Sequence, residues 1–529
     1  MRRLADEVTR SQAIPRVLVQ PRAAVLGALA VVVAVAVGGM VRLWALGAVG
    51  FNSDEAVYAG QAAALAGNAD YAKFFAIFRA HPLLVQFLLS GVFSFGVSDV
   101  AARLLSVTMG LAAIPLIYLL GALLYSRRVG IVAAAVLALL PYHVAVTRQV
   151  LLDGPETTLF LLSMLLLALY VARSQARYLY LFAAAAGLTF LAKETAILVV
   201  PVAIAFVLMT PTVRLGWRRV AVAFGILALS ISPYPISILV SGASGTAQSF
   251  LLWQLLRRPN HSFTFYAEVL PGAIGWVLLL LAIVGLVVAV RRAAWQDRLL
   301  LAWVLVPLIF YQLWPVKGYQ YLLPIAPALI ILGVRVIWVI ARAVTRRLAR
   351  NGWSPARSRL VFQASSAAIA AVLLASVAVP TVANLGPGGA AGSLAGTGGL
   401  PGAREAGGWI DENVPEGAAF MTIGPTLSNL IQFYGHRRSQ ALSVSPNPLH
   451  RNPAYDPIAN PDSTIRTLRI QYLAWDIWSA ERSPHFESTL LRYVAKYHGS
   501  LIHEQQAEVR RADGTRATET VIRIYEVRP

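Results

Sequence analysis

Long apolar stretches, separated by short polar segments, fill roughly the first 385 residues of the chain. A helix needs about 20 apolar residues to cross a bilayer core that is about 30 Å thick. We therefore predict a multi-pass α-helical membrane protein with about eleven transmembrane helices, at residues 24–46, 101–124, 129–147, 156–172, 178–193, 195–211, 220–240, 271–290, 299–314, 320–341 and 360–382.

The pattern changes after the last of these stretches. Residues 386–402 are rich in Gly, Ala, Ser and Pro, the composition of a flexible linker. Residues 403–529 then alternate between helical and strand periodicity, which predicts a soluble α/β domain. We expect helices at residues 403–413, 427–434 and 486–497, a loop at 446–461, and strands at 418–423, 440–444, 470–475, 500–504 and 520–527.

Composition agrees with this division. Hydrophobic residues make up 57% of the chain and charged residues only 13%, which leaves too few polar side chains to cover a soluble globule. The chain contains no cysteine, so disulfides, thiolate metal sites and a cysteine nucleophile are excluded. Residues 403–529 carry 14 basic and 14 acidic residues, so the membrane part, with 31 against 11, holds the whole net charge of +20.

The arginines set the expected orientation. Residues 83–97 are short for a span, and placing them flat on the outer surface makes every predicted inner loop basic, as the positive-inside rule requires. We therefore predict a protein of the plasma (inner) membrane, with a cytoplasmic amino terminus (residues 1–23), a membrane domain (24–385) with its first outer loop at 47–100, and an extracytoplasmic carboxyl-terminal domain (403–529). Contacts with anionic inner-leaflet lipids account for the remaining charge, and clustered loop arginines do not indicate nucleic-acid binding.

In this orientation eight of the 11 acidic residues of the membrane part lie on its outer side. Asp54 and Glu55 are adjacent in the first outer loop, with Tyr58 one turn later. They are candidates for chemistry, although acids also favour the first turn of a helix for purely structural reasons. The same loop carries Lys73, Arg79 and His81-Pro82. These cations would suit a phosphate, or they are simply solvated loop residues and, for His81, a helix start.

Three more outer segments carry polar residues. Asp153 precedes the helix breakers Gly154-Pro155, and the Lys193-Glu194 pair lies in a very tight turn. That pair is as compatible with an ion pair between two helices as with ligand binding. Lys317 and Tyr319 lie in an aromatic outer segment, where an interfacial belt is the simpler explanation.

These segments resemble, in order and spacing, the GT-C membrane glycosyltransferases, specifically the protein O-mannosyltransferase and aminoarabinose-lipid A transferase group. The similarity covers roughly residues 24–330, and the chain differs from the first subgroup at Leu83, where a second proline is usual, and from the second at His81, where a lysine is typical. The matching residues are Asp54-Glu55 with Tyr58, His81-Pro82, Leu152-Asp153 with Pro155, Lys193, and Tyr321-Leu322 with Pro324.

The resemblance implies that a sugar moves from a polyprenyl phosphate to an acceptor hydroxyl on the outer face, with inversion at the anomeric carbon. A phosphate leaving group needs no acid, so a single base suffices, and Asp54 is the candidate. The expected partners are a polyprenyl-phosphate sugar, membrane lipids, and an acceptor that is protein, glycan or lipid. Donor and acceptor binding is expected from Glu55, Tyr58, Lys73, Arg79, His81, Asp153, Lys193, Glu194, Lys317 and Tyr319.

Three questions stay open at this point. The sequence does not settle whether the protein needs a metal, because Asp54, Glu55 and His81 would hold a divalent ion if they converged. A transporter or flippase of lipid-linked saccharides also fits many spans with polar outer loops, although carriers usually place ionisable groups near the bilayer midplane. A scaffold that binds envelope partners would need neither Asp54 nor Lys193.

Overall fold

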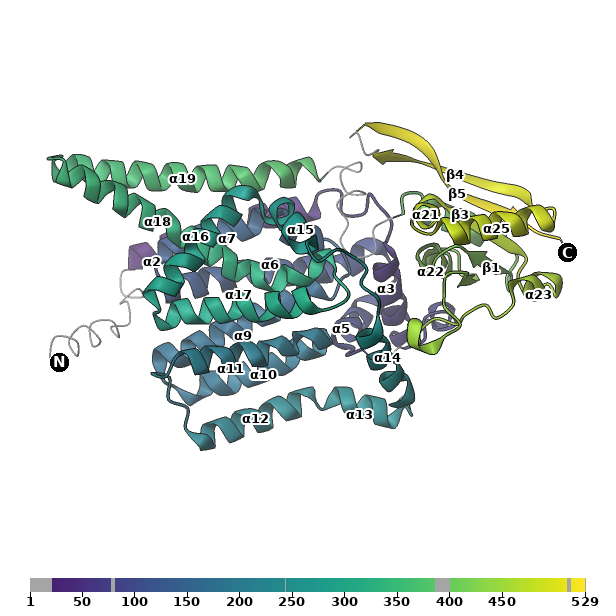
Figure 1. The fold of residues 1–529 in the computed structure, drawn as a ribbon, viewed down its shortest axis with the longest axis horizontal. Helices are drawn as coiled ribbons and strands as arrows, with labels where there is room; N and C mark the ends of the chain where they lie inside the picture. Colours follow the sequence, from purple (N-terminus) through teal and green to yellow (C-terminus); the bar gives the residue numbers. More distant parts are fainter. Residues whose placement is uncertain (1–20, 78–80, 243, 386–399, 511–514, 529) are drawn as a thin grey trace.

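The computed structural model describes residues 21–77, 81–242, 244–385, 400–510 and 515–528. Figure 1 shows a long helical bundle with a smaller α/β domain attached at one end. This confirms the predicted fold class. Most of the predicted linker, and Arg79 in the first outer loop, lie outside the described residues.

Each predicted span coincides with a helix or with a pair of consecutive helices. By length and hydropathy, five of the described helices are able to cross a membrane, or up to eight if each bent pair counts as one span. Ala176–Ala192 and Glu194–Met209 are apolar but shorter. The helices of the bundle are α2 (Pro21–Leu43), α6 (Asp99–Leu124), α7 (Arg127–Leu139), α8 (Pro141–Thr147), α9 (Asp153–Arg173), α10 (Ala176–Ala192), η1 (Glu194–Leu198), α11 (Val199–Met209), α12 (Trp217–Ile231), α13 (Pro233–Val240), α16 (Trp276–Arg292), α17 (Trp295–Leu313), η2 (Tyr319–Ile325), α18 (Ala326–Arg350) and α19 (Pro355–Ala383).

Three predicted spans, at residues 129–147, 220–240 and 271–290, are broken, and two of the breaks have clear local causes. Pro141 lacks a backbone N–H and begins a new helix, so α7 and α8 meet at 56°. Gly275, at φ +82°, turns the chain by 112° between α15 (Phe265–Ile274) and α16. The residues predicted as one straight span at 271–290 are therefore divided between α15 and α16. Helix α14 (Ser244–Leu256) was not predicted.

Short helices of the first outer loop lie at the end of the bundle that faces the α/β domain (Figure 1). They are α3 (Ser53–Leu65), α4 (Ala69–Ala72) and α5 (Leu84–Phe93). With 10 residues, α5 is too short to span a bilayer. It packs against α3, α6 and α10. That α5 lies flat on the membrane, and that this end faces outward, stay predictions.

Buried polar side chains join the helices of the bundle. The Arg42 guanidinium on α2 donates to the Ala138 carbonyl at 2.9 Å and to Thr147 Oγ1 at 3.0 Å, and lies 2.7 Å from His143 Nδ1. At the opposite end, Arg335 on α18 pairs with Asp297 on α17. Because unpaired charge is expensive inside a bilayer, these contacts keep their helices in a fixed register.

The carboxyl-terminal domain has a five-stranded mixed sheet with the order β2-β1-β3-β5-β4. Strands β1, β2 and β3 are parallel to one another, and β5 is antiparallel to β3 and β4. Its elements are α21 (Ala403–Asn413), β1 (Ala419–Thr422), α22 (Pro425–Tyr434), β2 (Arg438–Ala441), η3 (Pro448–His450), α23 (Pro461–Arg466), β3 (Tyr472–Asp476), α24 (Ile477–Arg482), α25 (Pro484–Lys496), β4 (Ser500–Arg510) and β5 (Arg516–Glu526). Strand β2 begins two residues earlier than predicted, and the β4–β5 hairpin is longer.

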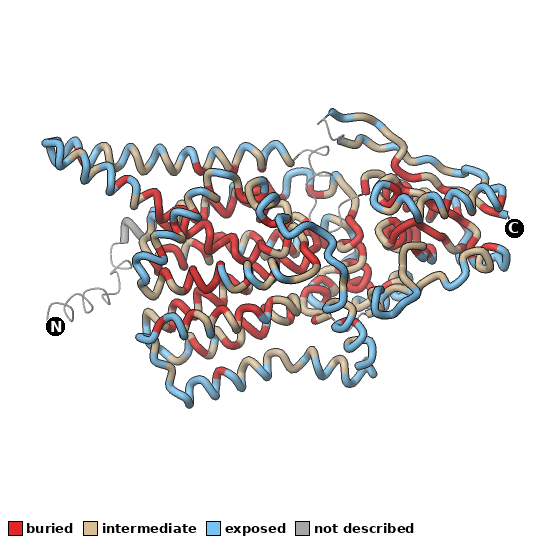
Figure 2. Tube along the Cα trace, in the orientation of Figure 1, coloured by how far each residue is buried: buried red, intermediate tan, exposed pale blue. Residues whose placement is uncertain are grey.

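The domain shares one hydrophobic core with the first outer loop. Apolar residues of α3, α5, α21, α22 and the sheet are buried in a single cluster. At the contact, the Phe51 ring lies 5.1 Å from that of Phe433 on α22. Figure 2 shows buried residues both in this region and inside the bundle, whereas the residues of α12, α13 and α19 are mostly intermediate or exposed. Helix α3 therefore packs against the α/β domain on one side and against the bundle on the other.

Candidate active site

The first turn of α3 positions the two adjacent carboxylates. Asn52 caps the helix: its Oδ1 accepts from the Glu55 backbone N–H at 2.9 Å, and the Glu55 carboxylate accepts from the Asn52 N–H at 3.0 Å. This capping box fixes where the helix begins. Since consecutive helical residues point about 100° apart, the side chains of Asp54 and Glu55 enter different surroundings.

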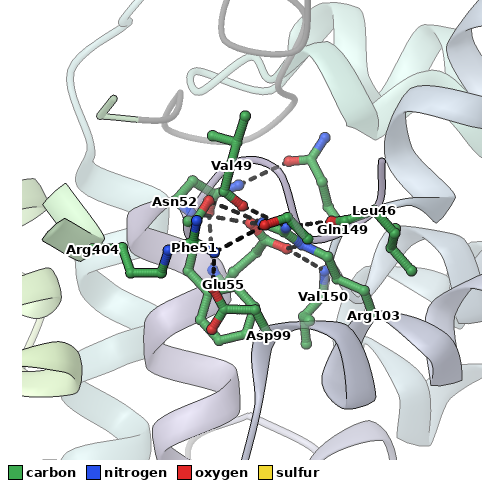
Figure 3. A network of polar contacts seen from close by, with 12 residues as sticks. Leu46, Val49, Phe51, Asn52, Glu55, Asp99, Arg103, Gln149, Val150 and Arg404 are labelled. Atoms are coloured by element: carbon green, nitrogen blue, oxygen red, sulfur yellow. Dashed lines mark hydrogen bonds and ion pairs between the residues drawn. The ribbon is translucent and has the colours of Figure 1, made fainter. Parts of the chain in front are cut away.

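Glu55 is fully buried, and both of its oxygens are occupied (Figure 3). Arg103 on α6 donates to both oxygens, each at 2.8 Å, and the Val150 backbone N–H donates to Oε1 at 2.9 Å. The predicted alternative of a purely structural carboxylate thus describes the contacts of Glu55. It ties the first outer loop to α6 and to the segment before α9.

Asp54 has the opposite character. Among the described residues its carboxylate has no hydrogen-bond partner, and it is half-buried in the first turn of α3. Burial, and secondly the nearby charge of Asp153, raise the pKa of Asp54 from 3.8 to about 6, although Lys193 and Arg257 act in the other direction. A carboxylate without a partner, held close to several charges, is what a reacting base requires.

Lys193 lies at the centre of a cluster beside Asp54. Its Nζ is 2.6 Å from Asp153 Oδ1 and 3.7 Å from Glu156 Oε2, both in the first turn of α9. It also lies 4.6 Å from the centre of the Tyr321 ring. The tight turn between α10 and η1 places Lys193 here because residue 193 leaves helical geometry, with φ −160° and ψ 136°. The ion-pair alternative for Lys193 is confirmed in part, since the lysine pairs with Asp153 on another helix, and a ligand role stays a prediction.

Two cations, Arg257 beside this cluster and Lys317 on the segment joined to it, have no carboxylate partner among the described residues. Arg257 follows α14, stacks 4.4 Å above the Trp253 ring, and donates to Gln254. Its charge acts on both Asp54 and Tyr321. Lys317 is buried, with Nζ 3.5 Å from the Trp314 carbonyl. Asn260, three residues after Arg257, exchanges two hydrogen bonds with the Lys317 backbone at 2.8 and 2.9 Å, so the two segments are joined.

The remaining predicted residues are distributed around this centre. His81 Nδ1 lies 3.1 Å from Glu194 Oε2, and its ring packs 4.4 Å from that of Phe250. Lys73 pairs with Asp70 at 3.0 Å, and both are exposed. No group of three or more His, Asp or Glu residues within the described ranges could hold a metal ion, so Asp54, Glu55 and His81 do not form one there.

The two predicted tyrosines play different parts. Tyr58, one turn after Asp54 on the same helix face, is half-buried, and Asp54 is the first charge that acts on it. The Tyr319 carbonyl accepts a hydrogen bond from the Tyr142 hydroxyl, and the two rings lie 4.9 Å apart. Tyr319 thereby fixes η2, and it is Tyr321, two residues later, whose ring covers Lys193.

The α/β domain reaches the site through α22. Asn429 Nδ2 donates to Ser53 Oγ at 2.8 Å, next to Asp54, and to the Tyr455 hydroxyl at 3.0 Å. The Tyr434 hydroxyl donates to Asp99 Oδ2 at 2.7 Å and accepts from the Phe51 N–H. These contacts orient the first turn of α3 from the side opposite to Arg103.

Arg257, Tyr321, Arg103 and Tyr455 were not among the predicted site residues. One signal was present for Arg257: it forms an adjacent pair with Arg258 on the predicted outer side, against the positive-inside rule. Arg103 and Tyr455 carry no comparable signal, because their partners are 48 and 26 residues away in sequence.

Comparison with known proteins supports the architecture. A family model described as dolichyl-phosphate-mannose-protein mannosyltransferase matches residues 80–236. Over 93% of this chain and 97% of the other, the structure is similar to that of ArnT from Cupriavidus metallidurans bound to undecaprenyl phosphate, with a TM-score of 0.65 and 16% identity. The chain has the GT-C fold.

Another structure with the GT-C fold is similar over the same share of the chain. It is the archaeal oligosaccharyltransferase AglB from Archaeoglobus fulgidus in complex with an inhibitory peptide and a dolichol-phosphate, with a TM-score of 0.57, 15% identity, and coverage of 93% of this chain and 74% of the other. A sequence comparison with curated proteins gives no match. At these identities the likeness concerns the fold, and it confirms the architecture that the sequence resemblance implied.

Proposed function

We propose that this protein transfers a sugar from a polyprenyl-phosphate donor to an acceptor hydroxyl on the outer face of the membrane, with inversion at the anomeric carbon. The observation that carries the proposal is the Asp54 carboxylate, which has no hydrogen-bond partner among the described residues and has a pKa raised to about 6. The family match and the two GT-C structures, which were determined in complex with undecaprenyl phosphate and with a dolichol-phosphate, support the donor class.

The reaction needs one base and one site for the leaving group. The acceptor oxygen attacks the anomeric carbon, the bond from that carbon to the phosphate oxygen breaks, and the acceptor proton passes to Asp54. Polyprenyl phosphate leaves as an anion, so no general acid is required. With a pKa near 6, Asp54 is mostly ionised at neutral pH and is still basic enough to take a proton as the hydroxyl attacks.

We assign the phosphate to Arg257 and Lys317 rather than to Lys193 or His81. Lys193 is already neutralised by Asp153, and His81 is paired with Glu194. Arg257 and Lys317 have no such partner among the described residues, so their charge is available to stabilise the developing negative charge on the leaving phosphate. Lys193, Asp153 and Glu156 then form an ion-paired cluster that lines the site beside Asp54.

Glu55 and Arg103 are positioning residues: they fix α3 relative to this cluster and do not contact the substrate. Their bidentate pair joins α3 to α6, and the bond from Val150 joins α3 to the segment that leads into α9. Asp54 and Asp153 therefore keep a fixed separation. Preorganisation of this kind lowers the barrier because no reorientation is needed during the reaction.

The test uses the full-length purified chain with the polyprenyl-phosphate sugar that accumulates when the gene is deleted. Asp54→Asn should abolish transfer to the envelope fraction of that deletion strain, while its affinity for undecaprenyl phosphate is kept. Asp70→Asn is the matched control, because this exposed carboxylate of the same loop pairs only with Lys73. Near-normal transfer by Asp54→Asn would remove the base from the scheme, and movement of the lipid-linked sugar across vesicles without transfer would favour a flippase.

A further inference from the structure

A loop of the α/β domain lies between α22 and α14 and brings Tyr455 close enough to Asp54 to feel its charge. It runs from residue 442, after β2, to residue 460, before α23, and contains η3 and Tyr455. One side of this loop meets α22 through the bond from Asn429 to Tyr455. The other side packs against α14 through η3. Since α14 leads into Arg257, the loop extends from the neighbourhood of Ser53 to the neighbourhood of Arg257.

Tyr455 has an available proton next to the site. Its hydroxyl oxygen accepts from Asn429, and its own O–H has no acceptor among the described residues. Burial raises the pKa of Tyr455, and the nearby charge of Asp54 raises it further. The phenol therefore stays protonated at any physiological pH and can donate one hydrogen bond to a molecule that enters beside Asp54.

The topology of the sheet explains why this edge faces the membrane domain. Strands β2, β1 and β3 are parallel, and the chain moves from β1 outward to β2 and then across to β3, so the strand order reverses beside β1. Ligands of parallel sheets usually bind in the crevice beyond the carboxyl ends of the strands at this point. Here α22 follows the carboxyl end of β1 and bonds Ser53 on α3, and the loop that follows β2 is joined to α22 through Tyr455 (Figure 1).

We propose that Tyr455 is an acceptor-binding residue: the α/β domain supplies its hydroxyl to hold a second oxygen of the acceptor while the reacting hydroxyl faces Asp54. Asn429 is the positioning residue, because the same amide group holds both Tyr455 and Ser53. The inference rests on the proposed transfer reaction and adds that the acceptor is recognised by the α/β domain. The polyprenyl phosphate lies on the other side, towards Arg257.

The experiment measures how much acceptor is needed. Full-length wild type and variants receive the polyprenyl-phosphate sugar extracted from the deletion strain, and the envelope fraction of that strain is titrated as acceptor. Tyr455→Phe should raise the half-saturating amount of envelope fraction by about two- to tenfold, the usual loss for one neutral hydrogen bond. Its affinity for undecaprenyl phosphate should not change.

Two further variants separate acceptor binding from a general loss of structure. Tyr497→Phe removes a phenol that bonds Asp462 at 2.8 Å in the same domain, and it should leave acceptor saturation unchanged. Asn429→Ala should also raise the half-saturating amount of envelope fraction. The effect of the double variant should be smaller than the sum of the two single effects, because both changes disrupt the same Asn429–Tyr455 arrangement.

Each remaining outcome contradicts a different statement. If the wild type transfers sugar and Tyr455→Phe saturates with acceptor like the wild type, the inference fails and the transfer reaction stands. Weaker undecaprenyl-phosphate binding by Tyr455→Phe would place the residue on the donor side and also overturn it. If the wild type transfers nothing and no sugar lipid accumulates in the deletion strain, both proposals fall.

Discussion

Replacing Asp54 by asparagine should make the protein more stable as well as inactive. The native state raises the pKa of this carboxyl from 3.8 to about 6, chiefly by burial. The folded protein therefore binds the proton more tightly than the unfolded chain, and the free energy of unfolding falls as pH rises from about 4 to about 6. Asparagine has the same shape and cannot ionise, so the variant does not lose this stability.

The size of the effect follows from the shift. At 1.36 kcal/mol per pKa unit, the variant should exceed the wild type by up to about 3 kcal/mol at pH 7.5 and by about 1.5 kcal/mol at pH 5. Thermal unfolding in detergent, followed through the fluorescence of the 12 tryptophans, measures the difference at both pH values. Asp70→Asn should give no gain, because Lys73 lowers the pKa of Asp70.

The dependence on pH is the decisive part of this measurement. A gain that is equal at pH 5 and pH 7.5 would show that packing, and not ionisation, separates Asp54→Asn from the wild type. An unchanged or lower stability at pH 7.5 would refute the reasoning that Asp54 is held in an unfavourable environment. Stability given up at one reacting group is common in enzymes, because the surroundings are arranged for the reaction and not for the resting charge.

Three further predictions follow from the contacts of the site. Because Asp54 must be ionised to accept a proton, kcat/KM should fall as the pH drops below about 6 and should be constant above it. A kcat/KM that stays constant down to pH 5 would exclude Asp54 as the base. Arg257→Gln should raise the Kd for undecaprenyl phosphate about tenfold, as expected for the loss of a charged hydrogen bond. Arg258→Gln, at the exposed neighbouring residue, should leave this Kd unchanged. Equal effects of the two changes would show that the arginines attract the phosphate only through their net charge. Arg103→Met leaves the buried carboxylate of Glu55 without its cation and should lower the free energy of unfolding by about 3 to 5 kcal/mol in urea unfolding, with a loss below 1 kcal/mol contradicting a buried pair.

The sequence predicted the helices well and their interruptions poorly. Hydropathy averages over about 20 residues, so it detected the runs at 129–147 and 271–290 but not the breaks at Pro141 and Gly275. Helix α14 was missed because its 13 residues, with Ser, Gln and Gly in the first turns, fall below any span threshold. Helix α14 matters for the site because Arg257 directly follows its last residue.

The candidate site was predictable for those residues whose chemistry is visible locally. An Asp-Glu pair after a span and a Lys-Glu pair in a tight turn both stand out, and Asp54, Asp153 and Lys193 do lie close enough to act on one another. The residue pattern alone did not separate the two members of the Asp-Glu pair, and it was the family resemblance that singled out Asp54. Glu55 differs from Asp54 through its bond from the Asn52 N–H and through Arg103 and Val150, and these last two contacts come from α6 and from the segment before α9, far away in sequence.

The adjacent carboxylates also explain why the α/β domain is a structural part of the candidate site. The first turn of α3 needs one acid turned inward to Arg103 and the other left without a partner, and this is stable only if the turn cannot rotate. Arg103 fixes it from the bundle, while Asn429 and Tyr434 fix it from the α/β domain through Ser53 and Phe51. Removing the domain would expose the shared core and release one of these two restraints, so a loss of activity after truncation would report on the orientation of Asp54 as much as on acceptor binding. Point changes such as Tyr455→Phe, which keep the core intact, are the ones that distinguish the two.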